Sequence, residues 1–205
     1  MTENADHAVA SRRLSPEDRR RALLETGLRL FGSAPFDQVS LEDIAQAAGV
    51  SQPLIQHYFA SKRGYFVAVA RHGLDKLEAT TRTRAEGGAF EALESNLRAF
   101  FQFFGDHPAV AGLLKTATGF PEVAEMIDAY RSRTVDIVLD VLPVDARTAY
   151  TKAAIHAWNG LNQALVTRLR DDPSLTVDWA ARFSRDALLS LLKLAEHGGV
   201  PQDKR

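Results

Sequence analysis

The chain has no cysteine, so disulfides, thiolate zinc sites, iron–sulfur clusters and cysteine nucleophiles are all excluded. No segment approaches the roughly 18 consecutive apolar residues that a membrane-spanning helix needs. Residues 1–20 are polar and lack the basic start and apolar stretch of a signal peptide. We therefore expect a cytoplasmic protein that makes no membrane contact.

An excess of charge of one sign is also missing, because 25 Lys and Arg residues are balanced by 26 Asp and Glu residues. A net charge of −1 does not favour a nucleic-acid-binding protein, but a sum over the whole chain can hide a local basic patch. The densest basic cluster lies near the start of the chain and consists of Arg12, Arg13, Arg19, Arg20 and Arg21.

Catalytic signatures are scarce. The six histidines form no His-Glu-x-x-His pattern, and the sequence contains no G-x-S-x-G, no phosphate-binding loop and no Rossmann fingerprint. We therefore expect a protein that is not an enzyme and that has no metal site and no cofactor. With 205 residues, 45% of them hydrophobic, the chain can still bury a sizeable core.

Hydrophobic residues recur at helical spacing, and no stretch alternates with the period of a strand, so the sequence predicts an all-α protein of about nine helices. Serines in N-cap positions precede four of the expected helices, at Ser15, Ser40, Ser51 and Ser61. Ser40 and Asp43 form a capping-box pattern. The expected helices cover residues 15–32, 40–48, 51–59, 62–84, Phe90 to Phe104, 107–117, 121–141, 145–170 and 176–196.

The second and third of these helices are short and are joined by a tight turn. Gly49 can take the positive φ of that turn, and Ala45 is small enough to let the two helices cross closely. Ile55 and Phe59, four residues apart, are expected to face inward. This pattern predicts a helix-turn-helix whose third helix presents Gln52, Pro53, Gln56 and His57 to solvent, in a form that fits a major groove.

At these positions the sequence resembles the tetracycline-repressor (TetR) family of bacterial transcription regulators, most closely over residues 18 to 70. Five motifs match in register: Leu30–Phe31, Phe36 to Ser40, Ile44–Ala45, Ala48 to Ser51 and Tyr58 to Lys62. Three departures stand out, one of which is Glu42, an acid near the DNA side of the second helix that would repel phosphate. Gln56 replaces a phosphate-contacting Tyr, and Gly64 replaces an acidic residue that usually closes the cap of the fourth helix, so that helix is expected to start more loosely.

The resemblance implies which residues contact a double-stranded DNA operator. Gln52 would pair with adenine, while Pro53 and Leu54 would pack against thymine methyl groups. Gln56 would read a base or a phosphate, and an arm carrying Arg12 and Arg13 would reach a neighbouring groove. The sugar–phosphate backbone would be held by Ser40, His57, Tyr58 and Lys62. The full DNA-binding set is Ser40, Leu41, Ser51, Gln52, Pro53, Leu54, Gln56, His57, Tyr58 and Lys62.

The resemblance also implies two domains: a helix-turn-helix DNA-binding domain at 15–65 and a helical effector-binding and dimerisation domain at 66–200. A connecting helix at about 62–84 would transmit the effector's signal to the DNA-binding domain. Gly73 is expected to make this helix more flexible. The two C-terminal helices carry two apolar faces each, which fits a homodimer that binds a near-palindromic operator. We expect a repressor released by a small effector. The alternative is a ligand-independent helix-turn-helix protein with a filled helical core.

Aromatic residues crowd the expected second domain, with a few polar side chains among them. A mostly apolar lining with sparse polar anchors is typical of a small-molecule pocket, although such aromatic stripes more often form core. His156 is a further polar candidate. We expect an apolar or aromatic effector to contact Phe100, Phe101, Phe104, Tyr130, Ile155, Trp158, Asn159 and Asn162.

Overall fold

The computed structural model describes residues 15–81, 88–117, 119–141 and 148–198. Within these ranges the chain contains nine α-helices, one short 3-10 turn and no strand, which confirms the all-α expectation. The elements are α1 (Pro16–Ser33), η1 (Phe36–Gln38), α2 (Leu41–Ala48), α3 (Gln52–Phe59), α4 (Lys62–Thr81), α5 (Ala89–Asp106), α6 (Pro108–Ala117), α7 (Pro121–Val141), α8 (Ala149–Asp171) and α9 (Val177–Gly198). The expected arm with Arg12 and Arg13, and residues 82–84 of the expected connecting helix, lie outside the described residues.

Local sequence signals set the helix starts. The Ser15 hydroxyl accepts a hydrogen bond from the Asp18 amide at 3.0 Å and so caps α1. Ser40 and Asp43 form the predicted capping box at the start of α2. Gly49 ends α2 in the left-handed region, with φ 64°. Ser51 stands at the N-cap of α3, but its side chain makes no capping bond.

Two boundary expectations need correction. The start of α4 is not loose, because the Ser61 hydroxyl accepts a hydrogen bond from the Gly64 amide at 3.0 Å. A side chain is excluded at position 64, since a Cβ there would overlap the carbonyl oxygen of Phe59. The eighth helix begins at Ala149 rather than at 145, because the Thr148 side chain caps it by accepting from the Thr151 amide at 3.1 Å.

The helices pack around two hydrophobic cores. The first joins α1 to α4 with Phe103 of α5, with α6 and with the start of α7, and it includes Phe31, Ile44, Ile55 and Phe66. The second joins α5, the end of α7, α8 and α9. The helix-turn-helix therefore has no separate core of its own, because Val110, Leu113, Val123 and other residues of α6 and α7 contribute to it.

Glycines allow two close helix contacts in the first core. A Cβ at Gly32 of α1 would overlap Ala109, and one at Gly112 of α6 would lie 2.7 Å from the Gly32 carbonyl oxygen. Gly73 of α4 is buried, and a Cβ there would lie 3.1 Å from Val110 and 3.3 Å from Leu28. We expected Gly73 to soften α4, but the structure uses it to bring α4 close to α1 and α6.

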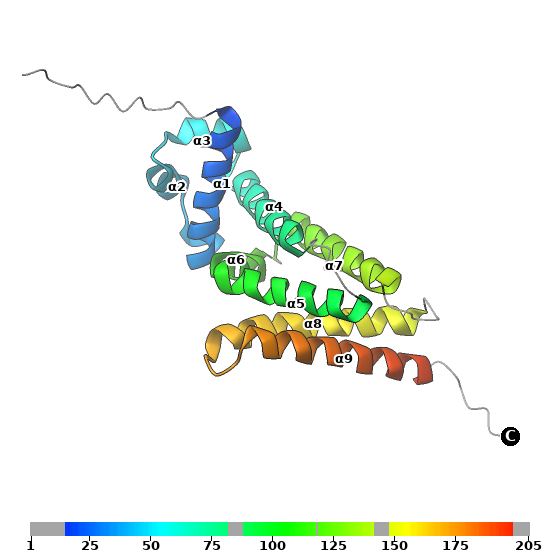
Figure 1. Ribbon diagram of the computed structural model, residues 1–205. Helices are drawn as coiled ribbons and strands as arrows, with labels where there is room; N and C mark the ends of the chain where they lie inside the picture. The colour runs from blue at the N-terminus through cyan, green and yellow to red at the C-terminus, as the bar shows by residue number, and fades with distance from the viewer. Residues whose placement is uncertain (1–14, 82–87, 118, 142–147, 199–205) are drawn as a thin grey trace, which may run out of the picture.

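Figure 1 shows the resulting arrangement. α2 and α3 lie at one end of the molecule with α1, while α8 and α9 run side by side at the opposite end. α4 and α7 extend between the two ends, and α5 and α6 lie between α1 and the α8–α9 pair. A signal between the two ends must therefore pass through α4, α5, α6 or α7.

Candidate nucleic-acid interface and ligand cavity

The two faces of α3 differ as the sequence predicts. Ile55 is fully buried and Phe59 is nearly so, which fixes the inward face of the helix. Gln52, Pro53 and Gln56 are exposed, as is His57 on the same side. Leu54 is half-buried and lies at the edge of this surface. The exposed face combines amide groups that can read base edges with apolar groups that can contact a thymine methyl.

The start of α2 is rigidly held. The Ser40 hydroxyl donates to the Asp43 carboxylate at 2.6 Å and accepts from the Asp43 amide at 3.0 Å, while the Ser40 amide also donates to that carboxylate at 2.7 Å. These bonds from the Ser40 side chain and backbone lower the pKa of the Asp43 carboxyl. Ser40 is exposed beside half-buried Leu41, so a phosphate can approach its hydroxyl, which must then release Asp43.

Other residues predicted to contact the DNA backbone already have contacts within the chain. The Tyr58 hydroxyl donates to the Pro16 carbonyl at 3.2 Å, which ties α3 to the first turn of α1. The Lys62 ammonium lies 4.2 Å from the centre of the Phe36 ring. Ser51 and His57 are exposed and accessible to a phosphate. Arg20 adds positive charge to this end of the molecule, with its guanidinium 5.4 Å from the centre of the Phe59 ring.

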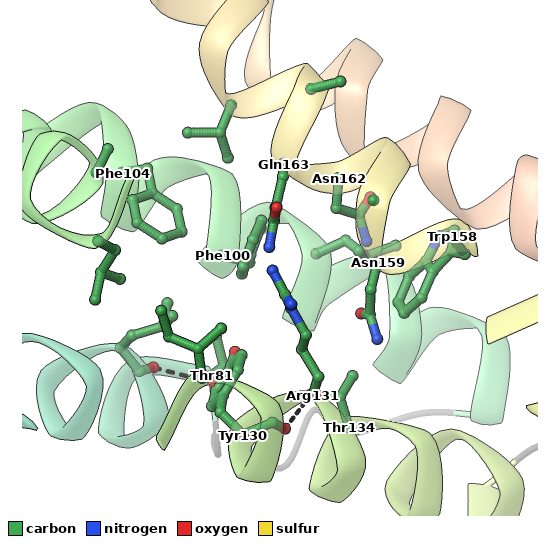
Figure 2. Close-up of a pocket in the computed structure, with 18 of the residues that line it drawn as sticks. Thr81, Phe100, Phe104, Tyr130, Arg131, Thr134, Trp158, Asn159, Asn162 and Gln163 are labelled. Atoms are coloured by element: carbon green, nitrogen blue, oxygen red, sulfur yellow. Dashed lines mark hydrogen bonds between the residues drawn. The ribbon is translucent and has the colours of Figure 1, made fainter. Parts of the chain in front are cut away.

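A cavity of about 620 Å³ opens between α4, α5, α6, α7 and α8 (Figure 2). Its size is within the usual range for small-molecule pockets. Six of the eight residues that we expected to contact an effector line this cavity: Phe100, Phe104, Tyr130, Trp158, Asn159 and Asn162.

Two expected ligand contacts need correction. Phe101 is 1% exposed and Ile155 is fully buried, and both pack inside the second core instead of lining the cavity. Their faces of α5 and α8 are covered by neighbouring helices of the same chain. His156 is exposed and is also absent from the cavity wall.

A buried polar network joins α8 to α9 beside the cavity. The Trp158 indole donates to both the carbonyl and the hydroxyl oxygen of Ser184, each at 2.9 Å. The Ser184 hydroxyl in turn donates to the side-chain oxygen of Asn162 at 2.5 Å. The indole N–H of Trp158 and the side-chain oxygen of Asn162 are thus engaged within the chain, so Trp158 offers a ligand mainly the surface of its ring.

Sequence reasoning missed several polar groups on the cavity wall, among them Arg131 and Gln163. Arg131 follows Tyr130 on α7, and Gln163 follows Asn162 on α8, so each is adjacent in sequence to a predicted residue. In Figure 2 Arg131 reaches from α7 toward Gln163 across the cavity. Burial raises the pKa of the Tyr130 phenol, so this group stays protonated at neutral pH.

An ion pair joins the start of α7 to the start of α4. Arg63 forms a bidentate ion pair with Glu122, with nitrogen–oxygen distances of 3.1 and 2.7 Å. Phe120, just before α7, packs edge-on against Phe36 at 4.9 Å and lies 4.6 Å from the Phe66 ring. Because α7 also lines the cavity further along, it connects the cavity to the helix-turn-helix end.

The C-terminal helices leave an apolar surface uncovered. On α9, Trp179 and Phe183 are 39% and 43% exposed and stack on each other at 5.1 Å, and Leu194 is 69% exposed. On α8 four small residues at helical spacing are exposed, Ala153, Ala157, Gly160 and Ala164, and the last two of these also line the cavity. The sequence predicted two apolar faces for α9. Leu188 and Leu192 lie on one of these faces and are buried in the second core.

Known proteins are similar both to the helix-turn-helix end and to a longer stretch of the chain. Residues 23–69, which span most of α1 through the first half of α4, match the family model described as bacterial regulatory proteins, tetR family. The regulator EthR of Mycobacterium tuberculosis is 30% identical over 151 residues, which cover 71% of this chain and 63% of EthR. The chain belongs to the tetR family of bacterial regulatory proteins.

Further relatives extend the similarity of this tetR-family chain. The transcriptional activator FasR of Mycolicibacterium smegmatis is 25% identical over 194 residues, 76% of this chain and 89% of FasR. A TetR-like regulator from Rhodococcus sp. RHA1 has the same fold, with a TM-score of 0.75 at 20% identity over 88% of this chain and 99% of that one. The shared fold thus includes the cavity-bearing C-terminal helices.

Two other kinds of site are absent from the described ranges. No helix there combines the length and apolar character that crossing a membrane requires. Nor do three or more His, Cys, Asp or Glu side chains gather there in a way that would hold a metal ion.

Proposed function

We propose that the protein is a homodimeric transcriptional repressor that binds a near-palindromic operator through α2 and α3 and is released by a small molecule bound in the cavity. The proposed division is a DNA-binding domain at 15–65 and an effector-binding and dimerisation domain at 66–200. The observation that carries the proposal is the exposed polar face of α3, mounted on a rigid helix-turn-helix within the region that matches the family model.

On this proposal Gln52 and Gln56 read base edges in the major groove, and Pro53 with Leu54 packs against thymine methyl groups. Ser40, His57, Tyr58 and Lys62 hold the sugar–phosphate backbone, and Leu41 and Ser51 complete the proposed DNA-binding set. A major-groove reader of this kind depends on phosphate contacts for much of its affinity, so binding is expected to weaken steeply with salt.

Homodimerisation through α8 and α9 is supported by the apolar surface that those helices leave uncovered. The small exposed residues of α8 would let a second copy approach closely, and Trp179, Phe183 and Leu194 of α9 would be buried against it. Two recognition helices of one dimer must reach major grooves about 34–36 Å apart, which implies a two-fold symmetric operator.

The cavity supports control by an effector, because α6 and α7 each line it and also contact the DNA-binding end. On α6, Ala111 and Leu114 face the cavity while Gly112 lies against α1. On α7, Tyr130 and Arg131 line the cavity, and the same helix begins at the ion pair with Arg63. An effector that favours one position of these helices shifts the population of DNA-competent dimers.

The first experiment selects bound duplexes from fragmented genomic DNA with the purified full-length protein and then titrates salt on the best site. An enriched near-palindrome and a steep loss of affinity with salt are expected. Gln52→Ala and Gln56→Ala should each weaken the selected site by about 1–3 kcal/mol and relax its sequence preference. Gln102→Ala, an exposed glutamine change on α5, is the control. Absence of any enriched sequence would contradict the proposal.

Coupling between cavity and operator is tested with Glu122→Gln, which removes the charge that pairs with Arg63. We expect this variant to bind a cavity ligand as wild type does but to show a smaller change in operator affinity on binding it. Glu125→Gln, an exposed change one turn further along α7, serves as the control. Equal coupling in all three proteins would exclude the Arg63–Glu122 connection from the mechanism.

The alternative, a DNA-binding protein without ligand control, predicts a filled helical core. The cavity of about 620 Å³ favours the ligand-controlled function instead. A relative, FasR, is named an activator, so transcription from the selected promoter with and without the protein measures the sign of regulation directly. Higher transcription in its presence would replace repression by activation and leave operator binding unaffected.

A further inference from the structure

The charged residues on the cavity wall are all of one sign. Lys115, Arg131 and Arg170 line the cavity, and none of the described lining residues is Asp or Glu. The wall is otherwise mostly apolar. A low-dielectric cavity whose charged wall residues are all basic strengthens the attraction of a bound anion and disfavours a bound cation.

Arg131 holds the most central of these charges. Its side chain comes from the middle of α7 and reaches across the cavity toward Gln163 of α8 (Figure 2). One guanidinium nitrogen lies 3.2 Å from the Asp128 carboxylate, which is 72% exposed and not part of the wall. Such an exposed partner neutralises a guanidinium only weakly, and the remaining N–H groups of Arg131 stay able to donate to a ligand.

Asn159 supplies a second, independent observation. Asn159 lines the cavity, and its side-chain nitrogen is buried and has no hydrogen-bond partner in the structure. A buried N–H donor without an acceptor costs about 1–3 kcal/mol, which a bound acceptor atom would recover. One turn along α8, the Ser184 hydroxyl satisfies the side-chain oxygen of Asn162. Among the described residues, the Asn159 nitrogen is the fully buried side-chain nitrogen or oxygen that has no partner.

Apolar side chains extend the cavity to both sides of this donor pair. Phe104 lies on one side, and Phe100 lies near Arg131 at the centre (Figure 2), while Leu114 and Ile127 add to the apolar lining. Trp158 flanks Asn159 on the other side. A ligand that fills the volume must therefore be largely hydrophobic while presenting one group that accepts hydrogen bonds.

We propose that the cavity selects an amphiphilic monocarboxylate, with its carboxylate held by Arg131 and Asn159 and its apolar body packed among Phe100, Phe104 and the surrounding aliphatic residues. This inference rests on the proposed function in one respect, that the cavity is the effector site. It adds the chemical class of the effector. A planar carboxylate matches the guanidinium fork and accepts from the Asn159 amide with a second lone pair.

Three ten-carbon probes that differ only in the head group test the proposal on the wild-type protein: decanoate, 1-decanol and decylamine. Binding is measured by calorimetry and by quenching of tryptophan fluorescence, since Trp158 lines the cavity. We expect decanoate to bind about tenfold more tightly than decanol, because a charged carboxylate forms a stronger hydrogen bond with the guanidinium than a hydroxyl does. Decylamine should bind most weakly, because its ammonium group is repelled by the basic wall. Equal affinity for decanoate and decanol would overturn the proposal.

Variants then locate the carboxylate. Arg131→Gln should weaken decanoate about tenfold or more and leave decanol within about twofold. Asn159→Asp keeps the shape of the side chain but adds a negative charge, so it should weaken decanoate and strengthen decylamine. Arg133→Gln is the matched control, because Arg133 pairs with Glu78 and does not line the cavity. Circular dichroism confirms that each variant is folded before binding is compared.

The readouts separate this inference from the proposed function. Head-group selectivity that disappears in Arg131→Gln and Asn159→Asp supports the carboxylate site, whether or not the protein binds an operator. Operator binding with no head-group selectivity supports the regulator and refutes the carboxylate site. Loss of decanoate affinity in Arg133→Gln equal to that in Arg131→Gln would also refute it, because the effect would then not depend on contact with the cavity.

Discussion

Ser184 provides the sharpest test of how the C-terminal helices are held together. It is fully buried on α9, and its hydroxyl donates to Asn162 and accepts from the Trp158 indole, both on α8. Ser184→Ala removes both bonds. Trp158 keeps its bond to the Ser184 carbonyl oxygen at 2.9 Å, so the group left without a partner is the side-chain oxygen of Asn162.

The expected loss follows from that single orphaned acceptor. Asn162 is only 5% exposed, so water cannot easily replace the lost donor, and the free energy of unfolding should fall by about 1–3 kcal/mol. In a chain of this size each kcal/mol lowers the melting temperature by about 2–4 °C. Ser184→Ala should therefore melt about 2–12 °C below wild type.

A double variant separates the unpaired oxygen from any change in packing. Combining Ser184→Ala with Asn162→Leu removes both partners, and replacing both ends of a buried hydrogen bond by apolar groups is nearly neutral. The double variant should thus recover most of the lost stability, which appears as a coupling energy in a double-mutant cycle. Urea unfolding is compared at equal protomer concentration, because dimerisation would make stability depend on concentration.

Ser190→Ala is the control, since Ser190 lies on the same helix but is exposed and bonds only the Asp186 carbonyl. It should stay within about 0.5 kcal/mol of wild type. The reasoning is refuted if Ser184→Ala unfolds at the same urea concentration as Ser190→Ala. It is also refuted if adding Asn162→Leu makes the protein less stable than Ser184→Ala alone.

Three further predictions concern the DNA-binding end. Gly49→Ala should cost about 1–2 kcal/mol by urea unfolding, because φ is 64° there and no neighbour would touch the added methyl, and Gly49→Asn should cost less. Gly112→Ala should destabilise by about 1–3 kcal/mol, because its Cβ would press on the Gly32 carbonyl, whereas Gly105→Ala, which meets open space, should not. The Ser40 bonds lower the folded-state pKa of Asp43, so the stability they provide is present above about pH 4 and lost as the pH falls further. The difference in urea midpoint between wild type and Ser40→Ala should therefore shrink from pH 6 to pH 3, and a constant difference would contradict this assignment.

Local sequence signals predicted the helix-turn-helix end well. The Ser15 cap, the Ser40–Asp43 capping box and the left-handed Gly49 each depend on residues three or four apart, so the sequence displays them directly. The inward face of α3 follows from helical periodicity in the same way. The loose start expected for α4 was wrong, because the Ser61 hydroxyl caps the helix by accepting from the Gly64 amide, a bond that needs no acidic side chain at position 64.

The ligand cavity could be predicted only in part. Periodicity showed that α5 and α8 carry more apolar residues than one face needs, but it could not say which neighbour covers each face. Phe101 and Ile155 are covered by helices of the same chain, whereas Phe100 and Asn159 line the cavity. Arg131 was missed because a lone arginine on a helix is usually solvated, and only the packing of α7 turns it inward.

The sequence by itself determined the all-α class, most helix boundaries and the exposed residues of α3, because hydrogen bonds and caps within a helix are short-range. Only the tertiary structure decided that α6 and α7 contact both the cavity and the DNA-binding end. It also decided that Ser184 satisfies the side-chain oxygen of Asn162 and that the buried nitrogen of Asn159 keeps no partner. Those outcomes depend on which helices meet across tens of residues, and many pairings of amphipathic helices satisfy the same periodicity.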